Sequence, residues 1–399
     1  MKAFFKGLGI GLAIGIPILL ALILYFKITA QKLPDGPSAD SLTTQETLPD
    51  RPLPEEESVS ETEEQPETPP LTDDTDLPSR PEEPRSATLA FAGDVQFPDH
   101  YLNAYDRSGI SAIADAGMLE EMQSADLFLL NEEFPFSLRG EPMPDKQFTF
   151  RTDPKYVKIL QDLGTDMVTV GNNHALDFGQ DAFLDTLDTL QQADIACIGG
   201  GRNISEASAP AVRTIGDQTF AFFGATRVSP SYDWYATDSQ PGLFQTYDPA
   251  KLNAAIAQAE EAYDHTIVFV HWGIEKSETP EEYQRVLAKG YIDAGADLVV
   301  GCHPHVLQGF EYYKGVPVIY SLGNYLFGSR GGETLLLKAI FSPGEPLTIQ
   351  LVPCQRQDGV LSRIQESSAL YQRLRDLSFH ADISEDGILR AQENIPPES

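Results

Sequence analysis

The chain has 399 residues, of which 41% are hydrophobic, and a formal net charge of −32. A chain of this length and composition can bury a substantial core, although one domain of ordinary size would not use all of it. The acidic balance argues against nucleic acid as a partner, because nonspecific nucleic-acid binding depends on Lys and Arg side chains that neutralise phosphates.

Residues 1–32 are predicted to form an N-terminal membrane anchor. The run from Gly7 to Phe26 carries no charge, and its length is about the ~20 residues that cross a bilayer. The run does not end in the small-residue pattern of a signal-peptidase site, so an uncleaved anchor is favoured over a cleaved signal peptide. Lys2 and Lys6 favour a cytoplasmic N-terminus. We therefore expect a single-pass protein of the cell membrane with an extracytoplasmic globular domain.

Residues 33–86 are predicted to be a disordered, acidic, Pro-rich linker. This segment contains 16 acidic and three basic residues and almost no aliphatic periodicity. Such a sequence cannot bury enough apolar surface to offset the entropy of ordering it. Repulsion between its carboxylates should keep it extended.

The sequence from residue 87 onward alternates short β-branched or aromatic runs with amphipathic helices, which is typical of an α/β fold. The predicted strands are Thr88–Phe91, Leu127–Leu130, Met167–Val170, Ile195–Ile198, Phe220–Phe223, Thr266–Val270, Leu298–Val300 and Val316–Tyr320. The predicted helices are Ile110–Gln123, Pro154–Leu163, Asp181–Gln192, Pro249–Tyr263 and Glu281–Ala294.

Two later runs, Thr334–Phe341 and Leu347–Pro353, have no helix between them and suggest a second sheet. The predicted domain covers residues 87–353. Residues 354–399 are expected to add a helix near Ala369–Leu377, packed on the domain, and a loose tail.

Polar residues follow five of the predicted strands directly. In open α/β sheets, ligands collect at the carboxyl ends of the strands, so these five segments should converge. Taken singly, each segment could be ordinary turn chemistry or a hydrogen-bonded core histidine. Their recurrence after five strands favours a site that contains Asp94, Glu133, Asn173, His174, His271, His303 and His305.

These side chains offer a mixed set of oxygen and nitrogen ligands. Such a set suits Mn, Fe or Zn better than Mg or Ca. The number of ligands is sufficient for two divalent ions, and two close ions can together stabilise a phosphoryl or acyl transition state. The three cysteines, Cys197, Cys302 and Cys354, are odd in number and widely spaced, so no disulfide framework is expected.

Residues 87–353 resemble the CapA family of poly-gamma-glutamate capsule biosynthesis proteins, which are related to the calcineurin-like metallophosphoesterases. The resemblance covers nearly all of the predicted domain. Its motifs are Phe91-Ala92-Gly93-Asp94, Asn131-Glu132-Glu133-Phe134-Pro135, Phe150-Arg151, Gly171-Asn172-Asn173-His174-Ala175-Leu176-Asp177-Phe178-Gly179, Val270-His271-Trp272-Gly273, His303-Pro304-His305 and Tyr320-Ser321-Leu322-Gly323-Asn324.

The resemblance implies a four-layer αββα sandwich of the metallo-dependent phosphatase type with two divalent metal ions. By analogy, one ion would be bound by Asp94 and His305 and the other by Asn173, His271 and His303, and Glu133 would bridge them. His174 would then serve as a general acid or bind the leaving group.

Two further residues are candidates near this site. Arg151 would bind a phosphate or carboxylate of the substrate, with a structural ion pair as the alternative. Glu275 would orient an imidazole of the site from outside the ligand set. The sequence departs from the phosphoesterase pattern at Gln96, which stands where an imidazole is expected, so the first metal site could be weak. Cys302 could ligate a soft metal as a thiolate, although a buried, inert thiol fits the sequence better.

The sequence therefore supports two main hypotheses. The first is a metal-dependent hydrolase that acts on a phosphoester or an amide in capsule or envelope-polymer biosynthesis. The second is a non-catalytic component that binds or exports an anionic polymer such as poly-gamma-glutamate, together with membrane-bound capsule-synthesis proteins. A third, weaker hypothesis is a surface adaptor, which the polar site residues disfavour because burying them without a metal is costly.

Overall fold

A computed structural model describes residues 85–328 and 330–392 of the chain. The predicted anchor, and all but the last two residues of the predicted linker, lie outside this part. None of the helices in the described ranges is both long enough and apolar enough to cross a membrane.

The larger sheet has ten strands. Its main path runs in the order β17-β18-β15-β14-β1-β2-β3-β4, while β13 pairs with β1 and β16 pairs with β15. The strands are β1 (Ala87–Val95), β2 (Leu127–Glu132), β3 (Met167–Thr169), β4 (Ala196–Ile198), β13 (Asn324–Leu326), β14 (Gly332–Phe341), β15 (Thr348–Gln357), β16 (Val360–Arg363), β17 (Ala381–Ile383) and β18 (Ile388–Ala391).

The second sheet has six strands in the order β11-β12-β10-β9-β7-β6. They are β6 (Ala211–Ile215), β7 (Gln218–Thr226), β9 (His265–His271), β10 (Leu298–Cys302), β11 (Phe310–Tyr313) and β12 (Val316–Ile319). A small antiparallel pair joins β5 (Gly200–Gly201) to β8 (Gly242–Leu243).

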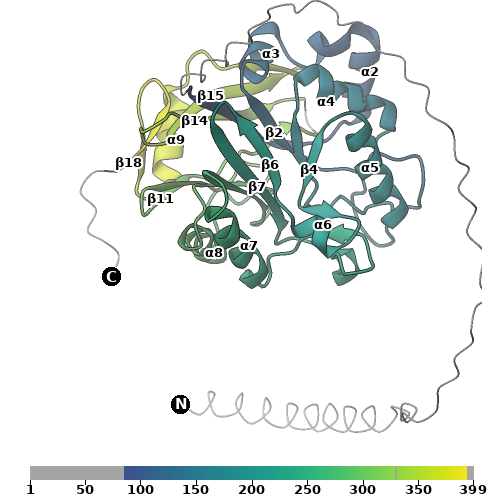
Figure 1. Ribbon diagram of the computed structural model, residues 1–399. Coiled ribbons are helices and arrows are strands. Elements are labelled where there is room, and N and C mark those ends of the chain that lie inside the picture. The colour runs from purple at the N-terminus through teal and green to yellow at the C-terminus, as the bar shows by residue number, and fades with distance from the viewer. Residues whose placement is uncertain (1–84, 329, 393–399) are drawn as a thin grey trace, which may run out of the picture. The chain divides into compact units, whose positions relative to one another are not determined.

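The two main sheets pack face to face, and helices cover their outer faces (Figure 1). Alternate side chains of each strand explain this layering, since successive residues of a strand point to opposite faces. Phe91 and Leu129 of the larger sheet pack with Phe269 of the second sheet in the central core. In contrast, Phe128 packs with helix residues on the outer face of the larger sheet, and Val268 does so on the outer face of the second.

The outer face of the larger sheet packs against α3, α4 and α5, and that of the second sheet against α7 and α8. The α-helices are α2 (Asp99–Ser108), α3 (Ala116–Gln123), α4 (Val157–Leu163), α5 (Gln180–Gln192), α6 (Ile204–Ser208), α7 (Ala250–Glu260), α8 (Glu282–Asp293) and α9 (Ser368–Leu377). Three 3-10 helices are η1 (Gly109–Ala112), η2 (Pro154–Tyr156) and η3 (Tyr232–Trp234).

The helix predicted from Ile110 to Gln123 is divided into η1 and α3. The Asp115 side chain accepts a hydrogen bond of 2.8 Å from the Met118 backbone N–H and so caps α3 at its N-terminus. The preceding residue, Ala114, forms a bridge to Leu361 instead of continuing a helix. A strong N-cap and a tertiary backbone contact therefore override the apolar periodicity of this segment.

The prediction that Thr334–Phe341 and Leu347–Pro353 form a second sheet is wrong. These runs become β14 and β15 of the larger sheet, because β14 pairs antiparallel with the first half of β1. The second half of β1 pairs with β13, with Asp94 opposite Asn324. The second sheet is built instead from strands that lie between Ala211 and Ile319.

The C-terminal segment contributes more than a helix and a tail. The boundary expected after Pro353 falls inside β15, which continues to Gln357. The chain then forms β16, α9, β17 and β18, and all three of these strands join the larger sheet. The expected helix corresponds to α9, whose Leu370 and Leu374 are buried against the core between the sheets.

Candidate metal centre

Polar side chains from both sheets meet at the carboxyl ends of parallel strands. We call this set the polar cluster; its members are Asp94, Glu133, Asn173, His271, Cys302, His303 and His305. They lie at or just after the ends of β1, β2, β3, β9 and β10. Most are buried, and Asp94 and Glu133 have no exposed surface. Cys302 joins the six residues predicted as metal ligands.

Glu133, His303 and His305 form the first group that could hold a metal ion, with one potential ligand atom from each lying within 4.8 Å of the others. His305 Nδ1 lies 3.0 Å from Asp94 Oδ2 and 2.8 Å from Asn324 Oδ1. Because both neighbours are acceptors, Nδ1 carries the proton and Nε2 keeps its lone pair. That Nε2 atom lies 3.8 Å from Glu133 Oε1.

Among the residues that the structure describes, two buried atoms of this first group have no hydrogen-bond partner, namely Glu133 Oε1 and His303 Nδ1. An unsatisfied buried polar atom costs about 1–3 kcal/mol. Two such atoms beside a third ligand therefore require an explanation, and a coordinated cation would satisfy both. The residues of the polar cluster thus fit a metal ion in position and in chemistry.

Asp94, His271 and Cys302 form the second group, again with one potential ligand atom from each within 4.8 Å of the others. His271 Nδ1 lies 3.2 Å from Cys302 Sγ, while His271 Nε2 lies 2.8 Å from Asn173 Oδ1. The division of the ligands between the two groups differs from the one that the resemblance implied, since His303 is grouped with Glu133 and His305 instead of with His271. Carboxylate, imidazole and thiol together are donors suited to Zn or Fe.

Hydrogen bonds join the two groups into one network. Asn131 Nδ2 donates to Asp94 Oδ1 at 2.9 Å and to Glu133 Oε2 at 3.0 Å. The Asn131 Oδ1 atom in turn accepts a hydrogen bond of 3.1 Å from Asn172 Nδ2. Asn131 and Asn172 therefore orient the carboxylates from behind, a role that supporting side chains commonly have around metal sites.

The His303-Pro304-His305 loop is held in an unusual backbone conformation. His303 has φ 98° and His305 has φ 58°, a region that residues other than Gly and Asn rarely adopt. The backbone N–H of His303 lies 3.2 and 3.3 Å from the two oxygens of Asp94, which fixes the loop against β1. Strained backbone of this kind gathers at functional sites.

The electrostatics favour neutral imidazoles. Burial, reinforced by His305, lowers the pKa of His303 to about 3. Burial likewise lowers the pKa of His271 well below its usual value. Both rings therefore present lone pairs at neutral pH, which is the form that binds a metal ion.

The acidic groups behave differently from one another. Burial and then the neighbouring Asp94 raise the pKa of Glu133 well above its usual value, and burial does the same for the thiol of Cys302. Burial opposes ionisation of Asp94 too, but hydrogen bonds from His305 and Asn131 leave its pKa below the usual value. In the metal-free protein, burial thus favours the protonated forms of Glu133 and Cys302, whereas the hydrogen bonds to Asp94 favour its ionised form.

We predict that metal binding releases protons at pH 7. A divalent ion binds carboxylate and thiolate, whereas burial in the metal-free protein favours the protonated forms of Glu133 and Cys302, so metal binding should shift both groups towards proton loss. Calorimetric titration of the full-length protein with Mn²⁺ in two buffers of different ionisation enthalpy measures this release. A Glu133→Gln variant should release fewer protons, and heats that are independent of the buffer in the wild type would contradict the prediction.

His174 lies beside the polar cluster and is held by Asp177. His174 Nδ1 is 2.6 Å from Asp177 Oδ2, so Nδ1 donates and Nε2 is left bare. The ring stacks on Phe150 with centroids 4.2 Å apart. Burial lowers the pKa of His174, and the Lys146 cation lowers it further, against the opposing effect of Asp177. The imidazole is therefore poised to accept a proton at Nε2.

Lys146 and Asp177 are functional candidates that the sequence analysis missed. Lys146 Nζ forms an ion pair with Asp177 Oδ1 and donates to the Asn173 carbonyl at 2.5 Å. This lysine comes from the long segment between β2 and η2, which carries no periodic signal. Asp177 did offer a signal, since it stands three residues after His174 in the same motif.

Arg151 and Glu275 lie at the margin of the site. The Arg151 guanidinium donates to the carbonyls of Arg139 and Gly140 at 3.1 and 3.2 Å and stacks over Phe178. Glu275 is exposed. Its carboxylate acts on Lys146 and Glu133 through space, but within the described ranges it is not hydrogen-bonded to an imidazole of the site. The substrate-binding and orienting roles of these two residues remain predictions.

The fold and the polar cluster together define an α/β protein with a candidate metal centre at the carboxyl ends of its strands. A family model described as "Bacterial capsule synthesis protein PGA_cap" matches residues 88–329. This match covers more than half of the chain and includes every member of the polar cluster. The chain therefore belongs to the PGA_cap family of bacterial capsule synthesis proteins.

Two curated relatives carry names of the same kind. The chain is 31% identical over 243 residues to the "PGA biosynthesis protein CapA" of Bacillus subtilis strain 168, covering 60% of this chain and 63% of that protein. It is 27% identical over 315 residues to the "Capsule biosynthesis protein CapA" of Bacillus anthracis, covering 75% and 76%. The aligned part thus spans slightly less than two thirds of the Bacillus subtilis protein.

Solved structures are more distant. A hypothetical protein from Thermus thermophilus matches with a TM-score of 0.42 and 17% identity, covering 67% of this chain and 99% of that one. The sulfate thiohydrolase SoxB from the same organism matches with a TM-score of 0.40 and 13% identity, covering 75% and 62%. Because the similarity is this low, these structures provide no information about the activity of this chain.

Proposed function

We propose that this protein is a metal-dependent hydrolase of poly-gamma-glutamate capsule or related envelope-polymer biosynthesis, acting on a phosphoester or an amide bond. The observation that carries the proposal is a pair of buried ligand atoms, Glu133 Oε1 and His303 Nδ1, that accept or donate no hydrogen bond within the described ranges and lie among further potential metal ligands. Family membership supports the role in capsule biosynthesis, and the metal-ligand set of the polar cluster supports metal-dependent hydrolysis.

Two divalent ions, Mn, Fe or Zn, would be held by the polar cluster. Glu133, His303 and His305 would bind one of them, and Asp94, His271 and Asn173 the other, with Cys302 as a further donor. Bound ions would supply the Lewis acidity that hydrolysis of a phosphoester or amide requires. Gln96 is buried and offers an amide where the resemblance predicts an imidazole, so one of the two ions is expected to bind more weakly.

Side chains of the protein would transfer the proton that hydrolysis moves to the leaving group. His174 presents a bare Nε2 because Asp177 holds its Nδ1–H. His174 would therefore accept the proton of the attacking water at Nε2 and donate it to the leaving group, while Asp177 keeps the ring in one orientation. Lys146, which is paired with Asp177, keeps a positive charge close to a site that is otherwise rich in carboxylates.

A second candidate function is a non-catalytic polymer-binding or export role in the capsule-synthesis machinery. The amide of Gln96 at a position where related phosphoesterases place an imidazole favours it. In either case we propose that the uncharged run from Gly7 to Phe26 anchors the chain in the cell membrane and that the folded domain is extracytoplasmic. Its partners would be an anionic polymer and membrane-bound capsule-synthesis proteins.

The proposal is tested by an activity screen on the full-length protein. The protein is stripped of metal, reloaded with Mn²⁺, and assayed with phosphoesters and gamma-glutamyl amides. We expect hydrolysis that depends on Mn²⁺ and falls roughly 100-fold or more in His174→Gln, since general acid–base groups contribute about 10²–10⁴-fold. His380→Gln, which changes an imidazole just before β17, is the matched control and should retain activity. Bound metal without hydrolysis of either bond class would favour the non-catalytic role.

A further inference from the structure

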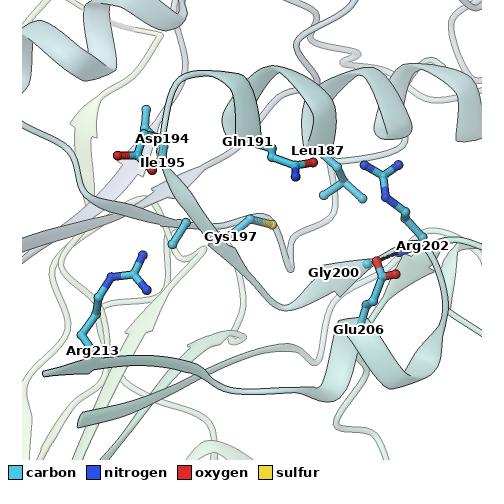
Figure 2. A pocket seen from close by; sticks show the side chains of 11 residues that line it. Leu187, Gln191, Asp194, Ile195, Cys197, Gly200, Arg202, Glu206 and Arg213 are labelled. Carbon is cyan, nitrogen blue, oxygen red and sulfur yellow. Dashed lines mark hydrogen bonds between the residues drawn. The ribbon is translucent and has the colours of Figure 1, made fainter. Parts of the chain in front are cut away.

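A groove runs between the edge strands of the two main sheets. The larger sheet ends at β4 and the second sheet ends at β6. A cavity of about 340 Å³ lies between them, beneath α5 and beside α6 (Figure 2). We call this cavity the edge groove; the lining residues that matter here are Leu187, Ile195, Cys197, Gly200, Arg202 and Arg213.

The middle of the edge groove is apolar, and each end carries one arginine with a carboxylate nearby, Glu206 beside Arg202 and Asp194 beside Ile195 at the Arg213 end. Leu187, Ile195 and Cys197 provide the apolar part. Arg213 lies at the end near Ile195, and Arg202 lies at the end near Gly200 (Figure 2). Two guanidinium groups separated by apolar surface suit a ligand that has spaced negative charges joined by methylene groups.

Arg213 has donors to spare for a ligand. Its Nη1 donates to the neighbouring Val212 carbonyl at 3.0 Å. The guanidinium has five N–H donors in a fork that matches a carboxylate. The Asp166 carboxylate acts on Arg213 through space, but its Oδ2 accepts the Phe128 backbone N–H at 2.8 Å and so faces the sheet.

The acidic residues near Arg202 are already engaged. Asp188 Oδ1 accepts a hydrogen bond from Arg202 Nη2 at 2.6 Å. Glu206 Oε2 accepts the backbone N–H of Arg202 at 2.9 Å, and its other oxygen accepts from Asn203 Nδ2 at 3.4 Å. Asp194 is exposed at the far end. The Arg202 side chain is 40% exposed, so its remaining donors can reach a ligand.

One end of the edge groove lies close to the segment that carries Asn173 and His174. Its lining follows β4 from Ile195, just before the strand, to Gly200 and Gly201, just after it. The intervening Gly199 packs closely on Gly171, where an added Cβ would lie 3.1 Å from the Gly199 carbonyl oxygen. Gly171 begins the segment that carries Asn173 and His174. One end of the groove is therefore next to the loop that supplies the candidate site.

We propose that the edge groove binds a carboxylate-bearing polymer chain whose neighbouring part reaches the polar cluster. A glutamyl chain fits this chemistry, because each repeat carries one carboxylate and a stretch of methylene groups. Arg213 and Arg202 bind carboxylates at the two ends, and the apolar middle of the groove contacts the methylene groups between them. This inference rests on the proposed role in polymer biosynthesis and adds the place where the polymer is held.

The test is the binding of a fluorescent gamma-glutamyl decamer to the full-length protein, measured by anisotropy at low salt. We expect the Arg202→Gln, Arg213→Gln double variant to bind at least 10-fold more weakly than the wild type. Arg213→Lys, which keeps the charge but loses the fork, should fall between the two. Arg373→Gln is the matched control because Arg373 is similarly exposed, at 43%, and also pairs with a carboxylate, Glu333. It should change binding less than 2-fold.

The outcomes separate the edge groove from the proposed function. Equal binding by the wild type and the double variant would contradict polymer binding in the edge groove, but would leave intact the proposal that the protein binds the polymer. No binding by the wild type would overturn the groove, while the hydrolysis screen would still stand as an independent test of the site. Unchanged melting and Mn²⁺ uptake in the double variant show that weaker binding does not reflect misfolding.

Discussion

Mn²⁺ is expected to raise the melting temperature of the full-length protein but not that of a His303→Ala, His305→Ala variant. A ligand that binds only the folded state stabilises it by about 2.7 kcal/mol at 100 times its Kd. For a domain of this size, that corresponds to a rise of roughly 5 °C or more. The double variant removes two of the three ligands in the first group and also the Nδ1–H that contacts Asp94.

Thermal melting with and without Mn²⁺ measures this effect. His380→Ala serves as the control because it removes an imidazole that lies outside the polar cluster. Its melting temperature should rise with Mn²⁺ as in the wild type. An equal Mn²⁺-induced rise in the double variant would show that the metal binds elsewhere.

A Gly93→Ala variant is expected to lose both stability and metal affinity. A Cβ at Gly93 would lie 1.9 Å from the carbonyl oxygen of Gly323, a backbone atom that cannot move as a flexible side chain can. The same oxygen accepts the Asp94 N–H at 2.9 Å. Relief of the clash must separate β1 from β13, which displaces Asp94 from Asn324 and so disturbs the support of His305. Overpacking that forces the backbone to shift typically costs about 1–3 kcal/mol, and the contact with backbone here places this variant at the upper end of that range.

Urea denaturation compares this variant with Gly117→Ala. Gly117 is exposed within α3, and an added Cβ there meets only the Asp115 side chain at 3.5 Å. That control should gain about 0.4–1 kcal/mol because alanine restricts the unfolded chain and favours helix. A Gly93→Ala variant as stable as the wild type would refute the close approach of β1 and β13.

Local sequence patterns predicted much of the fold but not its strand pairing. The buried strands were visible because their β-branched and aromatic runs are continuous and end in polar residues, as in β9 and β10. Helix α2 was missed because its apolar face is short, consisting of Tyr101, Leu102 and Tyr105 among polar and charged residues. The short strands β16, β17 and β18 gave no periodic signal. The place of β14 and β15 beside β1 depends on contacts between distant segments, which no local pattern records.

The residues of the candidate site were easier to predict from the sequence than the way in which they group in space. Asp94 and the histidines could be found because each follows a strand directly. How they divide into two groups depends on side-chain direction, so the grouping of His303 with Glu133 was not foreseen. Lys146 could not be predicted for a similar reason, since its segment contacts Asp177 only in the folded chain.

The central claim is that the polar cluster is a two-metal centre, and elemental analysis of the full-length protein tests it most directly. The account predicts close to two equivalents of Mn, Fe or Zn per chain, with both lost or strongly reduced in the His303→Ala, His305→Ala variant. Failure of the wild-type protein to retain any divalent metal, after reconstitution with each of the three, would contradict the account.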